Sequence, residues 1–190
     1  MSHDFLYNRH FLRFLLEADV ELAEQARLKG CPACGGRLHT AHYDRKPLGL
    51  AVPADWTRRF SFCCAREGCR KRCTPGSVRF LGRKWYVGAV VVLASMLYHG
   101  LTPARRDRLI ASFGVSERTL VRWRRWWIFD FATSRFWRAV RGLFGLPLAV
   151  EHLPRSLLER FEGDEQGQLV ATLRFLVPIT GGKGLAVHTW

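Results

Sequence analysis

Six cysteines lie between positions 31 and 73 of this 190-residue chain, and their spacing is typical of metal ligands. The first two stand in the segment Cys31-Pro-Ala-Cys34-Gly-Gly, where a tight turn directs both thiols to one corner of a tetrahedron. The glycine after the second thiol permits the positive φ that such a turn often needs. Six cysteines are too few for a disulfide scaffold in a chain of this length, so the cluster predicts metal binding.

A second pair of thiols follows on a predicted return strand. Side chains alternate in the segment 59–64, which places Phe60, Phe62 and Cys64 on one face. Cys69 then completes a Cys-x4-Cys hairpin. We therefore expect one Zn²⁺ ion held by four thiolates: Cys31, Cys34, Cys64 and Cys69. Such a site leaves no position for a reactive water, so the zinc is structural, and the ribbon around it needs the metal to fold.

Other ligand sets remain open. The alternatives are Cys63 in place of Cys64, Cys73 in place of Cys69, and a histidine ligand from His39 or His42. The simpler interpretation makes the two histidines surface or packing residues of the first strand. The two spare cysteines are then small, partly buried side chains.

The net charge of the chain is strongly positive and regional. The sequence has 30 Lys and Arg residues against 16 Asp and Glu, a formal charge of +14. Residues 45–141 contain 21 basic and 5 acidic residues, whereas the rest of the chain contains 9 and 11. All but five of the basic residues are arginines, whose forked guanidinium group suits phosphates and guanine edges. Double-stranded DNA is the predicted partner. A membrane surface is a weaker candidate, because the basic residues do not form the Lys-rich face opposite a large apolar face that is typical of helices lying on lipid.

Part of this basic excess surrounds the cysteines. Some of these residues offset the negative charge of four thiolates on a divalent cation, and others contact phosphates. The candidates for phosphate contacts are Arg70, Lys71 and Arg72.

Two helices joined by a tight turn are predicted between positions 102 and 127. Thr102 is the expected N-cap of the first, with Pro103 at its first position. Gly114 ends it, and Ser116 caps the second. The apolar run 87–97 is the helix on which both pack, which predicts a helix-turn-helix in a three-helix bundle.

The second of these helices, predicted from Glu117 to about Trp127, has two faces. Leu120, Trp123 and Trp127 recur at spacings of three and four and face inward. The opposite face is basic, and the N-terminal part of such a helix enters the major groove of DNA.

Each outward residue has an expected contact. Arg118 and Arg122 are candidates for base edges, and Glu117 for the amino group of cytosine. Ser116 and Thr119 are candidates for phosphates, and Arg124 and Arg125 for the flanking backbone.

The predicted fold is mainly α with a small β zinc ribbon, a helix-turn-helix three-helix bundle and flanking helices. We expect an N-terminal amphipathic helix in residues 1–30, the ribbon in 31–82, the helix-turn-helix domain in 83–131 and a C-terminal helical tail in 132–190. Two helical stretches, 156–161 and 169–176, are expected in the tail. Asp19 is an exception in the N-terminal helix, because the helical spacing turns it toward the apolar side.

A family resemblance rests on three stretches. They are Cys31-Pro-Ala-Cys34-Gly-Gly, the region from Phe60 through Cys64 and Cys69 to Gly82, and the segment from Leu101-Thr-Pro to Leu120-Val-Arg-Trp-Arg-Arg-Trp-Trp. Together they resemble the zinc-ribbon and helix-turn-helix proteins of bacterial insertion sequences, which are transposases or transposase-associated. The resemblance covers residues 31–130 and implies binding to the ends of a mobile element or to an operator.

No catalytic residues are expected. The chain lacks the long ribonuclease-H-like segment with which three-carboxylate transposases hold two metal ions. Two alternatives stay open: an accessory half of a split transposase or nuclease that uses Asp164 and Glu165, and an adaptor that docks a separate recombinase or transposase. A homodimer is also open. With no signal peptide and an apolar run of only fourteen residues (85–98), the expected location is the cytoplasm, at the bacterial nucleoid.

Overall fold

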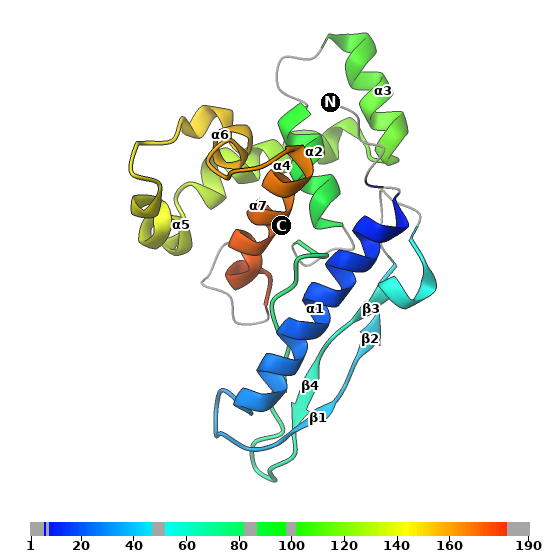
Figure 1. Cartoon of the computed structure of the whole chain (residues 1–190), viewed down its shortest axis with the longest axis vertical. Coiled ribbons are helices and arrows are strands. Elements are labelled where there is room, and N and C mark those ends of the chain that lie inside the picture. The colour runs from blue at the N-terminus through cyan, green and yellow to red at the C-terminus, as the bar shows by residue number, and fades with distance from the viewer. Residues whose placement is uncertain (1–5, 7, 47–51, 82–86, 98–101, 182–190) are drawn as a thin grey trace.

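A computed structural model describes residues 6, 8–46, 52–81, 87–97 and 102–181 of the chain. The protein is mainly helical, with 59% of the described residues in helices, and these residues also form two small antiparallel sheets (Figure 1). None of the described helices is long and apolar enough to cross a lipid bilayer.

Helix α1 (Arg9–Lys29) lies along the length of the strands (Figure 1). Asn8 caps it by accepting a hydrogen bond of 2.8 Å from the backbone N–H of His10. The helix ends at Gly30, whose φ is +74° and whose absent Cβ would lie 2.8 Å from the carbonyl oxygen of Gly35. Only glycine fits this close approach, which delivers the chain directly into the first pair of cysteines.

Two small antiparallel sheets form the ribbon. One has the order β1 (Leu38–Thr40), β4 (Phe62–Cys64) and β5 (Arg72–Cys73), and the other pairs β2 (Tyr43–Asp44) with β3 (Arg58–Arg59). The register sets Leu38 opposite Cys64 and Thr40 opposite Phe62. Leu38, Phe62 and Cys64 are buried with Ala23 of α1 in a small core of their own. A 3-10 turn, η2 (Ala54–Thr57), joins this part to α1 through a 2.8 Å hydrogen bond from the Trp56 indole to the carbonyl oxygen of Leu12.

Helix α2 (Gly88–Leu97) is central and buried on nearly all sides. It packs against α3 (Pro103–Phe113), α4 (Glu117–Arg125) and α7 (Glu165–Thr180). A π-helical stretch, η3 (Trp126–Phe131), extends α4. Its wider turn was not predicted from the sequence, which gave an ordinary helix to about residue 127.

The C-terminal third of the chain belongs to the main core. It contains α5 (Arg135–Val140), the 3-10 turns η4 (Arg141–Phe144) and η5 (Val150–His152), α6 (Arg155–Leu158) and α7. One cluster of buried apolar residues extends from Leu6 to Ile179 and includes side chains of α1, α2, α4 and α7. The buried residues therefore do not separate at position 131, where the sequence suggested that a helical tail begins.

The segment 74–81, which leaves the ribbon, lies against both α1 and α7. A Cβ at Gly76 would lie 2.4 Å from a methyl group of Val177. The backbone of this segment therefore packs directly against a side chain of α7. The hydroxyl of Thr180 accepts a 2.7 Å hydrogen bond from the backbone N–H of Ser77.

Asp19 explains how α1 holds the same segment. Its buried carboxylate accepts hydrogen bonds from the Ser77 hydroxyl at 2.5 Å, the Val78 N–H at 2.7 Å and the Arg79 Nε at 2.8 Å. Arg79 in turn donates to the carbonyl oxygen of Trp56 at 2.5 Å and to that of Arg58 at 2.7 Å. Asp19, the polar residue on the apolar side of α1, thus holds the segment that leaves the ribbon against this helix.

Candidate metal centre and nucleic-acid interface

Four cysteines converge at the end of the ribbon. The Sγ atoms of Cys31, Cys34, Cys64 and Cys69 all lie within 4.8 Å of one another. Cys31 and Cys69 are 3.8 Å apart, and Cys34 and Cys64 are 3.5 Å apart. Tetrahedral coordination with metal–sulfur bonds of ~2.3 Å places neighbouring sulfurs ~3.8 Å apart, so the cluster is compatible with a metal site. In the described residues no other three His, Cys, Asp or Glu side chains converge in this way.

Two tight turns present these thiols. In the first, the backbone N–H groups of Cys34 and Gly35 donate to the carbonyl oxygen of Cys31 at 3.2 and 2.8 Å. In the second, the N–H of Cys69 donates to the carbonyl oxygen of Arg66 at 3.1 Å, after Gly68 at φ +79°. Gly36 faces the cluster closely, since a Cβ there would lie 3.1 Å from the sulfur of Cys64.

The thiols differ in acidity. Hydrogen bonding by the backbone of Ala33 lowers the pKa of Cys31 to about 7, although burial acts in the opposite direction. The backbone of Arg66 acts to lower the pKa of Cys64, but burial and the neighbouring thiols outweigh it and raise that pKa to about 12. All four side chains can therefore be thiolates at neutral pH only when a cation lies among them.

The alternative ligands lie elsewhere. The Cys63 thiol points to the other face of β4 and donates to the carbonyl oxygen of Arg70 at 3.3 Å. The Nδ1 atom of His42 lies 3.2 Å from the backbone nitrogen of Ser61, and its ring meets Phe60 and Phe62 edge-on. His39 is exposed, and Cys73 stands opposite Phe62 in β5. None of these four joins the thiol cluster.

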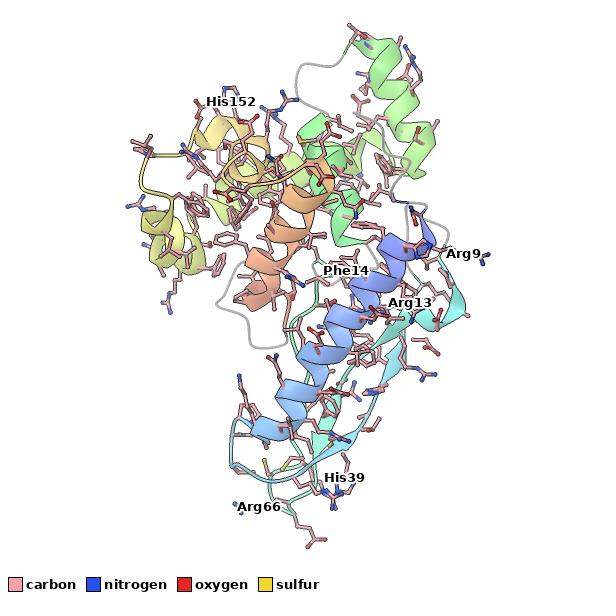
Figure 2. All side chains as sticks on the ribbon, viewed as in Figure 1. Arg9, Arg13, Phe14, His39, Arg66 and His152 are labelled. Carbon is pink, nitrogen blue, oxygen red and sulfur yellow. The ribbon has the colours of Figure 1, made fainter. Side chains whose placement is uncertain are left out.

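The residues predicted to contact phosphates from the ribbon are exposed. Arg70, Lys71 and Arg72 follow the Cys69 turn, in which Arg70 adopts a φ of +42°. The guanidinium group of Arg72 lies 5.6 Å from the ring centre of Tyr43. Figure 2 shows Arg66 and His39 at this same end of the molecule.

The turn between α3 and α4 occupies residues 114–116. Gly114, which was predicted to end the first helix, has φ 58° and ψ 31°, a left-handed conformation, and its N–H donates to the carbonyl oxygen of Ile110. The hydroxyl of Ser116 accepts a 3.3 Å hydrogen bond from the N–H of Thr119 and so caps α4. The inward residues Leu120, Trp123 and Trp127 are fully buried, as the spacing predicted.

The outward side of α4 is unequally exposed. Arg118 and Arg125 are exposed, whereas Arg122, Arg124 and Thr119 are partly buried. Glu117 forms an ion pair of 2.9 Å with Arg106 of α3, so its carboxylate links α4 to α3. The predicted contact residues of α4 therefore differ in role: Ser116 and Glu117 have structural partners, while Arg118 and Arg125 face solvent.

The ribbon arginines and α4 are not adjacent. The thiol cluster lies at one end of the long axis of the molecule and the α3–α4 pair toward the other (Figures 1 and 2). The regional excess of basic residues in 45–141 did not indicate this separation, because the sequence pattern carries no information on how far the ribbon extends from the helices.

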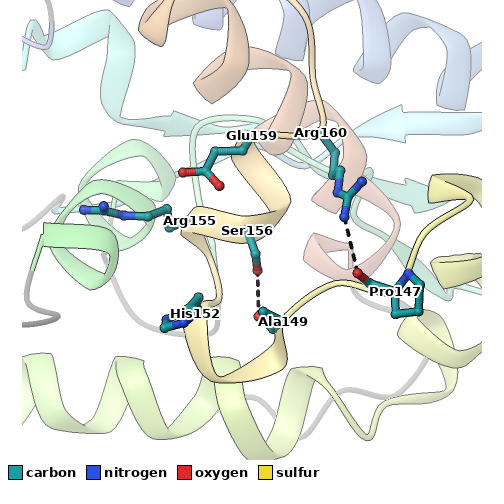
Figure 3. A pocket seen from close by; sticks show the side chains of 7 residues that line it. All are labelled: Pro147, Ala149, His152, Arg155, Ser156, Glu159 and Arg160. Carbon is teal, nitrogen blue, oxygen red and sulfur yellow. Dashed lines mark hydrogen bonds between the residues drawn. The ribbon is translucent and has the colours of Figure 1, made fainter.

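A pocket in the C-terminal part of the described chain was not predicted from the sequence. A pocket of about 440 Å³ is formed where residues 147–152 turn back onto α6, and it carries both charges, from Arg155, Glu159 and Arg160 (Figure 3). The Ser156 hydroxyl donates to the carbonyl oxygen of Ala149 at 2.8 Å across it. No sequence motif marks this pocket, because it depends on the turn.

Asp164, one of the two carboxylates considered for a nuclease, caps α7 by accepting a 2.8 Å hydrogen bond from the N–H of Gly167.

Comparisons with known proteins give no match: no family model, no curated protein and no solved structure is similar to this chain. The resemblance to insertion-sequence proteins therefore rests on the motifs of the chain alone.

Proposed function

We propose that this chain is a zinc-binding protein that recognises duplex DNA through α4. The observation that carries the proposal is the contrast between the two faces of this helix. One face is fixed in the core by Leu120 and Trp123, and the other presents Arg118 and Arg125 to solvent. A rigid helix with exposed arginines suits guanine edges in the major groove.

Zinc is the metal that best suits the ribbon. Four thiolates at tetrahedral spacing select zinc or iron, and zinc is the usual structural ion of two cysteine turns on a small sheet. The ribbon core has few apolar residues, so the free energy of metal binding stabilises its fold.

The ribbon end supplies a second contact in this proposal. Arg70, Lys71 and Arg72 are exposed and would hold phosphates without reading sequence. Since they lie far from α4 along the long axis, one duplex meets both only when it runs lengthwise along the protein (Figure 1). The motif resemblance favours the ends or operator of a mobile element as the target, with a separate recombinase or transposase as partner.

Selection from a random duplex library tests this function directly. The zinc-loaded chain should enrich a defined sequence, and about seven neutralised phosphates should give a slope of log affinity against log salt of about −6. Enrichment of no sequence, or binding independent of salt, contradicts the proposal.

A second candidate function, an adaptor that docks a recombinase, is favoured by a groove between α1 and α7. The groove has a volume of about 390 Å³, an apolar floor that includes Leu22 and Val177, and Glu21 and Arg174 in its lining. Retention of a partner by a variant without Arg118 and Arg125 would support the adaptor over DNA recognition.

A further inference from the structure

A row of three arginines follows α4 in the chain. Arg135 and Arg138 belong to α5, and Arg141 begins η4. All three side chains are exposed, and their spacing of three keeps them on one side of a short helix. Among the described residues, none of the three forms an ion pair.

Two arginines elsewhere on the surface of the described residues do form ion pairs. Arg13 bonds to Glu17 one turn along α1, and Arg106 bonds to Glu117 across the α3–α4 turn. Like charges at neighbouring positions of a helix repel each other and destabilise it. Three exposed cations without an acidic neighbour are therefore not explained by the stability of α5.

The opposite side of α5 is firmly held. Phe136 and Trp137 are buried, and their rings lie 6.2 and 5.2 Å from that of Phe131. Phe136 also meets Phe175 of α7 at 5.2 Å. A helix of six residues is not stable alone, so these contacts fix the direction of the arginines.

Arg135, the first residue of the row, lies close enough to α4 for one duplex to contact both. Residues 126–131 are helical, and only residues 132–134 intervene before α5. With a rise of ~1.5 Å per helical residue and ~3.5 Å per extended one, Arg135 lies no more than about 25 Å from Arg125. That is less than one turn of B-form DNA, about 34 Å.

We infer that Arg135, Arg138 and Arg141 form a second phosphate-binding row, which holds the backbone of duplex DNA beside the site that α4 reads. This inference rests on the proposed function and adds a contact that carries no sequence preference. Arginine rather than lysine at all three positions suits phosphate, to which the guanidinium group donates two parallel hydrogen bonds. Two exposed leucines nearby, Leu143 and Leu146, make an anionic membrane the competing partner.

The test is the triple variant R135Q/R138Q/R141Q of the zinc-loaded chain, with R9Q/R27Q/K29Q of α1 as the control. The control removes the same charge from three exposed residues of another helix. Fluorescence anisotropy measures affinity for the selected duplex and for an unrelated duplex at several salt concentrations. Circular dichroism and thermal melting establish that each variant is folded.

We expect the triple variant to lose affinity for both duplexes about tenfold or more. Its salt slope should fall by about 2.7, since each lost phosphate contact contributes ~0.9. The preference between the two duplexes should stay unchanged, and the control should stay within about threefold of the wild type.

Each contrary outcome identifies what has failed. Equal behaviour of the triple variant and its control overturns the second row while DNA recognition by α4 stands. Unchanged DNA binding, with loss of binding to vesicles of phosphatidylserine and phosphatidylcholine, assigns the row to a membrane surface instead. A wild type that binds no duplex at all overturns both the row and the proposed function.

Discussion

Asp19 of α1 and Arg79 of the segment that leaves the ribbon form an ion pair of 2.8 Å in which both side chains are completely buried. Sixty positions separate the two residues in the sequence. The pair is closed by hydrogen bonds on both sides, because Asp19 also accepts from Ser77 and Val78 while Arg79 also donates to two carbonyl oxygens. It joins the first helix to the ribbon and to the core at one point.

Removal of one partner of this pair should be strongly destabilising. Asp19→Ala leaves the guanidinium group of Arg79 buried without its counter-ion, which costs about 3–5 kcal/mol. Urea denaturation measures the change in the free energy of unfolding. The double variant Asp19→Leu/Arg79→Met should be less destabilised than the sum of its single variants, and strict additivity would show that the two residues do not act as a pair.

Arg59 is, like Arg79, a buried arginine whose pKa is lowered by burial. It is buried, its Nη1 atom has no hydrogen-bond partner among the described residues, and burial lowers its pKa to about 10. Because the folded-state pKa lies below the unfolded value, the unfolded chain binds more protons above pH 10 and the burial penalty falls as pH rises toward 12.5.

The measurement is thermal melting of the wild type and Arg59→Met between pH 9 and pH 11. We expect the wild type to gain stability relative to the variant as pH increases through about 10. A difference that is constant with pH would mean that the guanidinium group of Arg59 stays protonated in the folded protein over this range.

The four clustered cysteines should be distinguishable from the two others by metal content. Cys69→Ser removes a ligand and should abolish stoichiometric zinc, whereas Cys63→Ser should retain one ion per chain, because its thiol lies on the other face of β4. Elemental analysis of the purified variants gives the ratio directly. Equal loss from both variants would mean that the ligand set includes Cys63.

Glycine should be required at position 114 because of its backbone conformation, and not because a side chain there would clash with neighbouring atoms. A Cβ there meets no atom within 4 Å, but φ is +58°. Gly114→Ala should therefore cost about 1 kcal/mol, and Gly114→Asn less, because asparagine tolerates the left-handed region. Gly142→Ala is the matched control, since Gly142 also has open space around it and no positive φ. Chemical denaturation of the three variants should separate Gly114→Ala from the others.

Local patterns of the sequence predicted much of this architecture. The pairs Cys31–Cys34 and Cys64–Cys69 converge because each is set by a turn that neighbouring residues determine. The cap of α4 at Ser116 and its buried residues Leu120 and Trp123 follow from helical spacing. Such features depend on a few adjacent residues, and sequence reasoning serves them well.

Features that depend on distant residues could not be predicted in this way. Asp19 looked like an exception because its partner Arg79 lies far along the chain. The C-terminal third looked like a tail because α7 has apolar residues but no motif, although Leu173 and Leu176 complete the main core. The distance between the ribbon end and α4 is set by the length of the strands and by how α1 packs on them, and neither is written in a local pattern.

Specificity of binding tests the central claim, recognition of duplex DNA by α4, most directly. The measurement is the affinity ratio between the selected duplex and an unrelated one, for the wild type, Arg118→Ala and Lys71→Ala. We predict that Arg118→Ala lowers this ratio by about 5- to 150-fold, which corresponds to about 1–3 kcal/mol, while Lys71→Ala weakens binding to both duplexes equally and lowers the salt slope by about 1. An unchanged ratio in Arg118→Ala, measured on a folded protein, would contradict the account.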